Sequence, residues 1–324
     1  ASRRDTLATF ALYEQALPGL AVPERGELNP PLWELGHIGW FQEYWLARNP
    51  RRGDGAAADP DVPRARPLRP DADALYHSSL VPHDTRWSLP LPDAQSTRSE
   101  LARQLDSTLT LLGGVDAGDD DSLYFYRLAL LHEDMHHEAA LYMAQSLGVA
   151  IDDPRWQAAA LPVPPPAVHL PAGRWKLGSE VRRGFAFDNE LTAHEVEVPA
   201  CAIDAQAVRW AEYLPFVEAG GYGDARWWDD AGQRWLAEHH VAAPRYLRQI
   251  DGTWQHWRHG RWLALDLAEA ACHLTQHEAL AWCRWAGRRL PGEAEWERAA
   301  LTRPEAFRWG DVWEWTASPF QPFP

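Results

Sequence analysis

Two histidines, His132 and His136, lie in the middle of a run from Ser122 to Leu147 that predicts one long helix. Three aspartates before the run supply acceptors for the free N–H groups of a helix start, and Gly148 supplies a stop. Apolar residues recur at spacings of three and four, which predicts one buried stripe. The stripe comprises Phe125, Ala129, His132, Met135 or His136, Ala139, Met143 and Leu147. Two inward imidazoles one turn apart suit one shared metal ion, and a hydrogen-bonded pair of core histidines is the alternative.

A third candidate ligand, His37, lies in the apolar stripe of another predicted helix, which runs from Asn29 as N-cap to about Ala47. A single histidine in such a stripe is more often a core residue, but beside an inward pair it favours a metal site. The spacing of His132 and His136 also matches the zinc-protease pattern, in which Glu133 is a general base. The stripe places Glu133 away from the ligand face, which counts against a zinc hydrolase.

Two further helices are predicted, from Asp5 to Leu17 and from Thr97 to Leu112, with a long connection at 50–95 between the second and third helices. Four helices, two of them bearing ligands, indicate a four-helix bundle with a metal inside it. Beyond a Pro-rich linker at 157–167, alternation predicts strands at 168–178 and 194–198, and helices at 208–219 and 275–286. The sequence therefore predicts an α+β protein with two domains, a helical bundle at 1–156 and a second domain at 168–324.

Composition narrows the classes of function. The formal charge of −15 argues against nucleic acid as a partner. No run of 18 apolar residues occurs, so we expect no membrane span. Three cysteines, an odd and small number, are typical of reduced thiols in a cytoplasmic protein. Most of the 19 tryptophans lie beyond residue 150, which indicates an aromatic-packed second domain. A monomer or a weak homo-oligomer is expected.

Five motifs resemble one family. Residues 35–43 (LGHIGWFQE) and 132–138 (HEDMHHE) are similar to the bundle half, which is DinB-like, of the iron-dependent sulfoxide synthases of ergothioneine biosynthesis. Residues 187–190 (FDNE), 285–297 (WAGRRLPGEAEWE) and 312–320 (VWEWTASPF) are similar to their second half, which has the formylglycine-generating-enzyme fold, a C-type-lectin-like domain. A formylglycine generator is not favoured, because the second domain offers no paired reactive cysteines. Relatives continue past the position of Pro324, so we expect further substrate contacts there.

The resemblance implies a non-haem Fe(II) site held by His37, His132 and His136, with O2 as co-substrate. The implied acceptor is hercynine, whose imidazole C2 is joined oxidatively to a chalcogen. Glu138 becomes a candidate outer partner for a ligand imidazole, and a solvated helix charge is its alternative. An aromatic wall would suit the trimethylammonium group of hercynine. Trp313, Phe320 and Phe323 are available for it, although Trp313 and its neighbour Trp315 are better explained as core residues.

Residues 83–90 (HDTRWSLP) decide which donor we expect. Ergothioneine-type relatives carry an Arg-Arg-Gly-Leu-Leu-like run here that holds the carboxylates of γ-glutamyl-cysteine, whereas this chain keeps one arginine, Arg86, beside His83. A doubly anionic peptide should then bind less well. The stretch resembles the selenoneine synthase branch, which joins a selenosugar to hercynine. A thiol donor, γ-glutamyl-cysteine or cysteine, is the alternative, and a bundle without catalytic metal is a more distant one.

Overall fold

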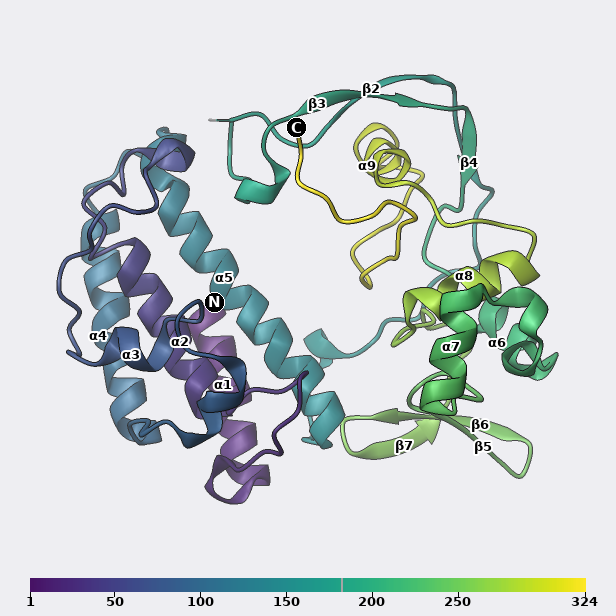
Figure 1. Cartoon of the computed structure of the whole chain (residues 1–324), viewed down its shortest axis with the longest axis horizontal. Helices are drawn as coiled ribbons and strands as arrows, with labels where there is room; N and C mark the ends of the chain where they lie inside the picture. Colours follow the sequence, from purple (N-terminus) through teal and green to yellow (C-terminus); the bar gives the residue numbers. More distant parts are fainter. Residues whose placement is uncertain (182) are drawn as a thin grey trace. The chain divides into compact units, whose positions relative to one another are not determined.

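The structure of the chain is a computed structural model that describes residues 1–181 and 183–324. Its internal contacts divide into two compact units (Figure 1). One unit comprises Ala1–Asp152 with Ser179–Leu191, and the other comprises Asp153–Gly178 with Thr192–Pro324. The first unit is helical and the second mixes helices with small sheets. The predicted mixture of helix and strand is therefore confirmed.

Four long helices form the framework of the first unit: α1 (Ser2–Ala16), α2 (Pro31–Trp45), α4 (Ala94–Leu112) and α5 (Asp120–Leu147). Helix α1 packs on α5, and α2 packs on both α4 and α5. The stretch expected to be one long connection contains a short helix, α3 (Ala72–Tyr76), and a 3-10 turn at His83–Ser88. Both segments border the three histidines and so contribute to the candidate site.

Helix α5 follows its predicted limits closely. It begins at Asp120, where the side chain of Asp119 accepts from the backbone N–H of Ser122, and it ends at Gly148 with φ +74°. The predicted stripe is wrong at one point, because Met135 is 54% exposed. The remaining members turn toward the unit as expected, since a straight helix places positions three and four apart on one face.

Helix α2 is the centre of the first unit, because residues on every side of it are buried. Its glycines allow this close packing. A Cβ on Gly36 would lie 2.3 Å from the ring of Tyr76, and one on Gly39 would lie 2.1 Å from Gln104 Oε1. The expectation that Asn29 caps this helix is wrong. Pro30 is the N-cap residue, and the side chain of Asn29 accepts a hydrogen bond from Arg86 at 2.8 Å instead.

The second unit holds three small antiparallel sheets among its described residues. The first pairs β1 (Val168–Leu170) with β4 (Cys201–Ile203), and the second pairs β2 (Gly173–Leu177) with β3 (His194–Val198). The third joins β5 (Leu247–Ile250), β6 (Thr253–Arg258) and β7 (Arg261–Ala264). The strand expected over 168–178 is therefore two strands in two sheets. Pro171 separates them, and proline lacks the N–H that a continuous ladder needs.

Four helices complete the second unit: α6 (Trp210–Glu218), α7 (Asp230–His239), α8 (Gln276–Trp285) and α9 (Glu293–Thr302). Its largest core is aromatic, as the tryptophan content predicts. Residues Trp210, Tyr213, Phe216, Tyr222, Trp228 and Trp282 are all buried in it. By contrast, Trp313 is 87% exposed and Trp315 is 49% exposed, so the expectation that these two are core residues is wrong.

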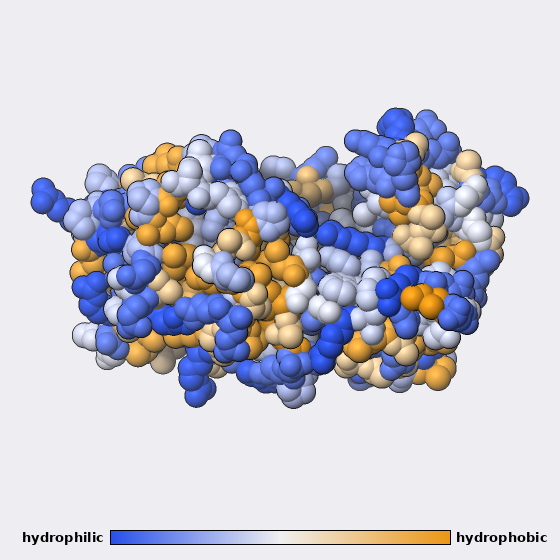
Figure 2. Space-filling view, turned by 90° about the horizontal axis from the view of Figure 1, so that it is seen from below, coloured by the Kyte–Doolittle hydropathy of each residue, from blue (hydrophilic) through white to orange (hydrophobic). Residues whose placement is uncertain are grey.

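The surface mixes polar and apolar residues, and the cysteines among the described residues form no disulfides. Hydrophilic and hydrophobic residues are interspersed over the face shown in Figure 2. Within residues 1–181 and 183–324, no helix combines the length and the apolar character needed to cross a bilayer. The three cysteines are free, and Cys283 is buried.

Candidate metal centre

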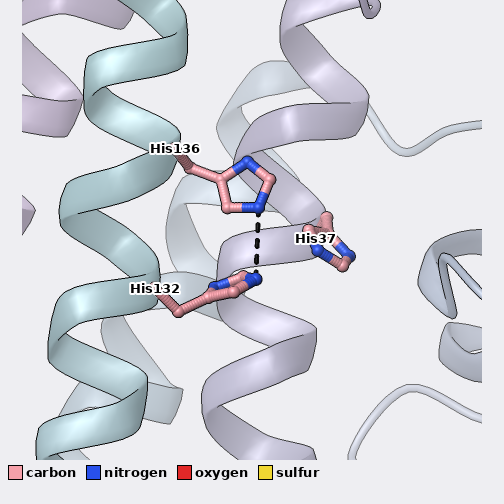
Figure 3. Close-up of side chains that lie close together, drawn as sticks. All are labelled: His37, His132 and His136. Carbon is pink, nitrogen blue, oxygen red and sulfur yellow. Dashed lines mark hydrogen bonds between the residues drawn. The ribbon is translucent and has the colours of Figure 1, made fainter. Parts of the chain in front are cut away.

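Three histidines from two helices converge in the first unit. His37 comes from α2, and His132 and His136 come from α5, where one helical turn separates them (Figure 3). Their candidate ligand atoms all lie within 4.8 Å of one another. The Nε2 atoms of His132 and His136 face each other at 3.1 Å. The sequence-predicted trio is thus brought together by the packing of α2 on α5.

The outer hydrogen bonds of two imidazoles determine which nitrogen faces inward. The Nδ1 of His37 lies 2.8 Å from the carbonyl oxygen of Tyr76, and a carbonyl can only accept, so this nitrogen carries the proton. The Nδ1 of His136 donates to a carboxylate oxygen of Glu34. In a neutral imidazole, a proton on Nδ1 leaves the Nε2 lone pair free for a ligand. In Figure 3 the Nδ1 of His136 points away from the other two rings.

Aromatic rings hold two of the imidazoles in place. Trp33 stacks on His37 with ring centroids 4.7 Å apart and planes 9° apart. Phe41 stacks on His132 at 3.5 Å with an angle of 4°. Both aromatic residues lie on α2, so this helix supplies one ligand and the packing surface for another. Stacked rings have few alternative rotamers, which keeps the histidines oriented before any ligand arrives.

Burial keeps two of the histidines neutral. It lowers the pKa of His37 to about 4, helped by repulsion from His136. It also lowers the pKa of His132 far below its usual range. For Glu34, burial is the largest single influence and opposes ionisation, but the hydrogen bond and the attraction from His136, together with smaller contributions from His37 and Asn29, outweigh it and the pKa falls below its ordinary value. Neutral imidazoles beside an ionised carboxylate are the protonation states that metal binding requires.

The spacing of His132 and His136 suits one shared metal ion, and the candidate ligand atom of His37 lies within 4.8 Å of theirs. Nitrogens about 2.1 Å from one ion, at tetrahedral or octahedral angles, lie roughly 3.0 to 3.4 Å apart, which matches the 3.1 Å between His132 and His136. A pair held only by a shared hydrogen bond would not explain the third ring, His37, whose centroid lies 4.8 Å from that of His136. The donor set of three imidazoles suits a transition metal rather than calcium or magnesium.

Two other acidic residues of α5 were candidates from the sequence. Glu133 is buried in an ion pair with Arg3, with 2.7 Å between Oε1 and Nε, and therefore does not face the histidines as a general base would. Glu138 is exposed, and its role as an outer partner of a ligand imidazole stays a prediction. The carboxylate that contacts a ligand imidazole is Glu34, which the sequence reasoning missed. Its signal was available, because Glu34 stands three positions before His37 and so shares its helix face.

The residues that were predicted to bind the chalcogen donor border the site. The guanidinium carbon of Arg86 lies 3.9 Å above the ring of Trp33, the same ring that stacks on His37. His83 is held by the carbonyl oxygen of Leu28 at 2.8 Å. The 3-10 turn at residues 83–88 therefore places Arg86 one aromatic ring away from a candidate ligand, whereas His83 mainly anchors the turn.

The predicted aromatic wall belongs to the second unit. Trp313 and Phe320 are 87% and 90% exposed, and the ring of Phe323 lies 4.8 Å from the ring of His194. Sequence patterns alone did not distinguish these exposed aromatic side chains from core residues.

The second part of the chain resembles a known domain family. Residues 156–311 match the family model of the sulfatase-modifying factor enzyme 1-like domain, so the second part of the chain carries a domain like that of the formylglycine-generating enzymes. The formylglycine-generating enzyme of Streptomyces coelicolor is 33% identical over 44% of this chain and 50% of its own length.

Two relatives are similar along nearly the whole chain. The hercynine oxygenase of Mycolicibacterium thermoresistibile is 31% identical over 92% of this chain and 74% of its own length. The hercynine oxygenase of Mycolicibacterium smegmatis is 30% identical over 92% of this chain and 77% of its own. Both alignments extend across the histidine-bearing helices as well as the second domain. The chain therefore belongs to the hercynine oxygenase family.

Proposed function

We propose that this protein is a non-haem iron enzyme that uses O2 to join a chalcogen donor to C2 of the imidazole of hercynine. The observation that carries the proposal is the convergence of three oriented imidazoles within 4.8 Å in a chain of this family. The first unit would be a DinB-like four-helix bundle that holds the metal, followed by a formylglycine-generating-enzyme-like domain. The domain limits expected from the sequence, 1–156 and 168–324, belong to the same proposal.

His37, His132 and His136 would hold the iron. When bound by three neutral imidazoles, Fe(II) keeps its charge and open positions and supplies one-electron redox chemistry toward O2. The protein's part is to orient the ligands through Tyr76 and Glu34 and to shield them with the rings of α2. Formation of the new bond would remove one hydrogen from C2 of the acceptor and one from the donor. O2 would be the four-electron oxidant, with one oxygen atom released as water with these two hydrogens and the other placed on the chalcogen as a selenoxide or sulfoxide.

We propose a selenosugar as the donor. Arg86 is the cation that residues 83–90 present beside Trp33, and one guanidinium pairs with one carboxylate rather than two. A donor with fewer charges than γ-glutamyl-cysteine fits this stretch better. The thiol version of the reaction is the second candidate, favoured by the names of the relatives, which specify hercynine and oxygenation but no selenium.

A zinc hydrolase is a weaker candidate on structural grounds. Its general base would be Glu133, and that carboxylate accepts two hydrogen bonds from the guanidinium of Arg3. Both oxygens of this carboxylate are thus occupied by Arg3 in a buried ion pair, and the carboxylate does not face the histidines.

One experiment tests the proposal. The protein is loaded with Fe(II) and given O2 and hercynine, with a selenosugar and γ-glutamyl-cysteine in parallel reactions, and the products are weighed by mass spectrometry. A hercynine adduct with the selenosugar alone supports the first donor, and an adduct with the peptide alone replaces it with the second. The matched control is the His132→Ala variant, which should form neither. No adduct from the iron-loaded native protein refutes the proposed function.

A further inference from the structure

The three imidazoles differ in what their outer nitrogens contact. The Nδ1 of His37 donates to a backbone carbonyl, at Tyr76, and the Nδ1 of His136 donates to the carboxylate of Glu34. The Nδ1 of His132 is buried and has no hydrogen-bond partner among residues 1–181 and 183–324. A negative charge therefore lies behind His136, a neutral carbonyl dipole lies behind His37, and among the described residues neither lies behind His132.

The surroundings of Glu34 fix its carboxylate. Glu34 is only 7% exposed, on a helix that is buried on every side. Its carboxylate accepts a hydrogen bond from the Nδ1 of His136. Asn29, which precedes this helix, accepts from Arg86 at 2.8 Å.

A carboxylate behind a ligand imidazole has two known physical effects. It locks the ring in the tautomer whose inner nitrogen is unprotonated, and it raises the electron density that this nitrogen offers to a metal. A buried carboxylate acts strongly, because little water screens its charge. Both effects are larger than a backbone carbonyl supplies.

We propose that Glu34 is the positioning residue of the metal centre, which orients His136 and makes it the most strongly donating of the three ligands. This inference rests on the proposed function, since it assumes that the histidines bind a metal.

Two variants separate the effect of the charge of Glu34 from the effect of its hydrogen bond to His136. Glu34→Gln keeps the shape and one acceptor but removes the charge, and Glu34→Leu removes both. The matched control is Glu43→Gln, because Glu43 is another buried glutamate of α2, which accepts from the backbone of Leu68 and from Gln104 instead. Helical circular dichroism shows that each variant is folded before binding is measured.

The affinity for Co(II) alone is measured by calorimetry, and the visible spectrum of bound Co(II) reports ligand geometry. We expect about 10- to 100-fold weaker binding for the Glu34→Leu variant, a smaller loss for Glu34→Gln, and native affinity for Glu43→Gln. Nitrogen NMR of the metal-free native protein should find the proton of His136 on Nδ1.

The outcomes separate this inference from the function on which it rests. Native affinity and spectrum in the Glu34→Leu variant, or a proton on Nε2 of His136, overturn the role of Glu34 and leave the metal site standing. Failure of the native protein to bind Co(II) or Fe(II) overturns the proposed function and the role of Glu34 together.

Discussion

Replacing Glu133 by glutamine tests whether this residue is structural or catalytic. Its carboxylate lies 2.7 Å and 3.1 Å from two nitrogens of Arg3, and both side chains are about nine-tenths buried, with 8% and 10% exposed. Arg3 also donates to the carbonyl oxygen of Leu101 at 2.9 Å, so it cannot turn to solvent without losing further bonds. The variant would leave a buried guanidinium without its counter-ion.

The expected loss in the free energy of unfolding follows from the burial of both side chains. Removing one partner of a buried pair costs about 3–5 kcal/mol, because the remaining charge stays desolvated. Glutamine keeps one acceptor and the volume, so we expect a value near 3 kcal/mol. The control is Glu14→Gln, whose partner Arg98 is 28% exposed while Glu14 is 31% exposed. That more exposed pair should contribute about 0–1 kcal/mol.

Denaturant unfolding followed by helical circular dichroism measures both variants, and metal content and turnover are measured on the folded protein. The prediction for Glu133→Gln is a loss of stability with metal binding retained. A loss no larger than that of Glu14→Gln would contradict the assignment of a buried structural pair. A fully stable, metal-loaded but inactive variant would restore Glu133 as a general base.

Three further predictions concern the donor, the packing of α2 and the effect of pH. Arg86→Ala should raise the donor's KM about 10- to 100-fold, the loss expected for one charge-assisted hydrogen bond, and change kcat less. Gly36→Ala should cost about 1–3 kcal/mol and weaken metal binding, because its Cβ would lie 2.3 Å from the ring of Tyr76, whose carbonyl orients a ligand. Burial lowers the pKa of His256 and His273 to about 4, so the folded second unit disfavours their protonation. Its stability should be full above about pH 6.5 and fall toward pH 4, by up to about 1.4 kcal/mol per pH unit for each histidine.

Each of these three predictions has a control or an outcome that would contradict it. An unchanged donor KM would assign Arg86 to structure alone, through its contact with Trp33. Gly26→Ala should be neutral, because nothing lies within 4 Å of its added Cβ, and an equal loss at both glycines would remove the argument from packing. His256→Gln should flatten the pH dependence measured by thermal unfolding, and an unaltered slope would show that this histidine is not responsible.

Local sequence signals predicted helices α1, α2, α4, α5, α6 and α8, but not α3, α7 or α9. The aspartates before α5 and Gly148 after it gave limits within two residues, because caps act through the nearest backbone groups. Strand limits were less predictable. The pattern over 168–178 alternates through Pro171, and only pairing with two different partners shows that it is two strands.

Whether a single side chain is buried or exposed was harder to predict. Met135, Trp313 and Trp315 are apolar residues at positions where burial was expected, yet all three are exposed. Burial depends on what another element places against a residue, and composition contains no record of that neighbour. Glu34 shows the reverse case, a charged side chain buried because its helix is surrounded by the rest of the unit.

The sequence by itself determined the candidate ligands, since the helical repeat puts His132 and His136 on one face and His37 on an apolar stripe of another helix. Only the tertiary structure decided how those ligands are held. Glu34 lies 102 positions before His136 in the chain, and Tyr76 lies 39 positions after His37. No periodicity connects residues so far apart, because contacts of that kind arise when whole helices pack, and packing depends on every side chain at the interface.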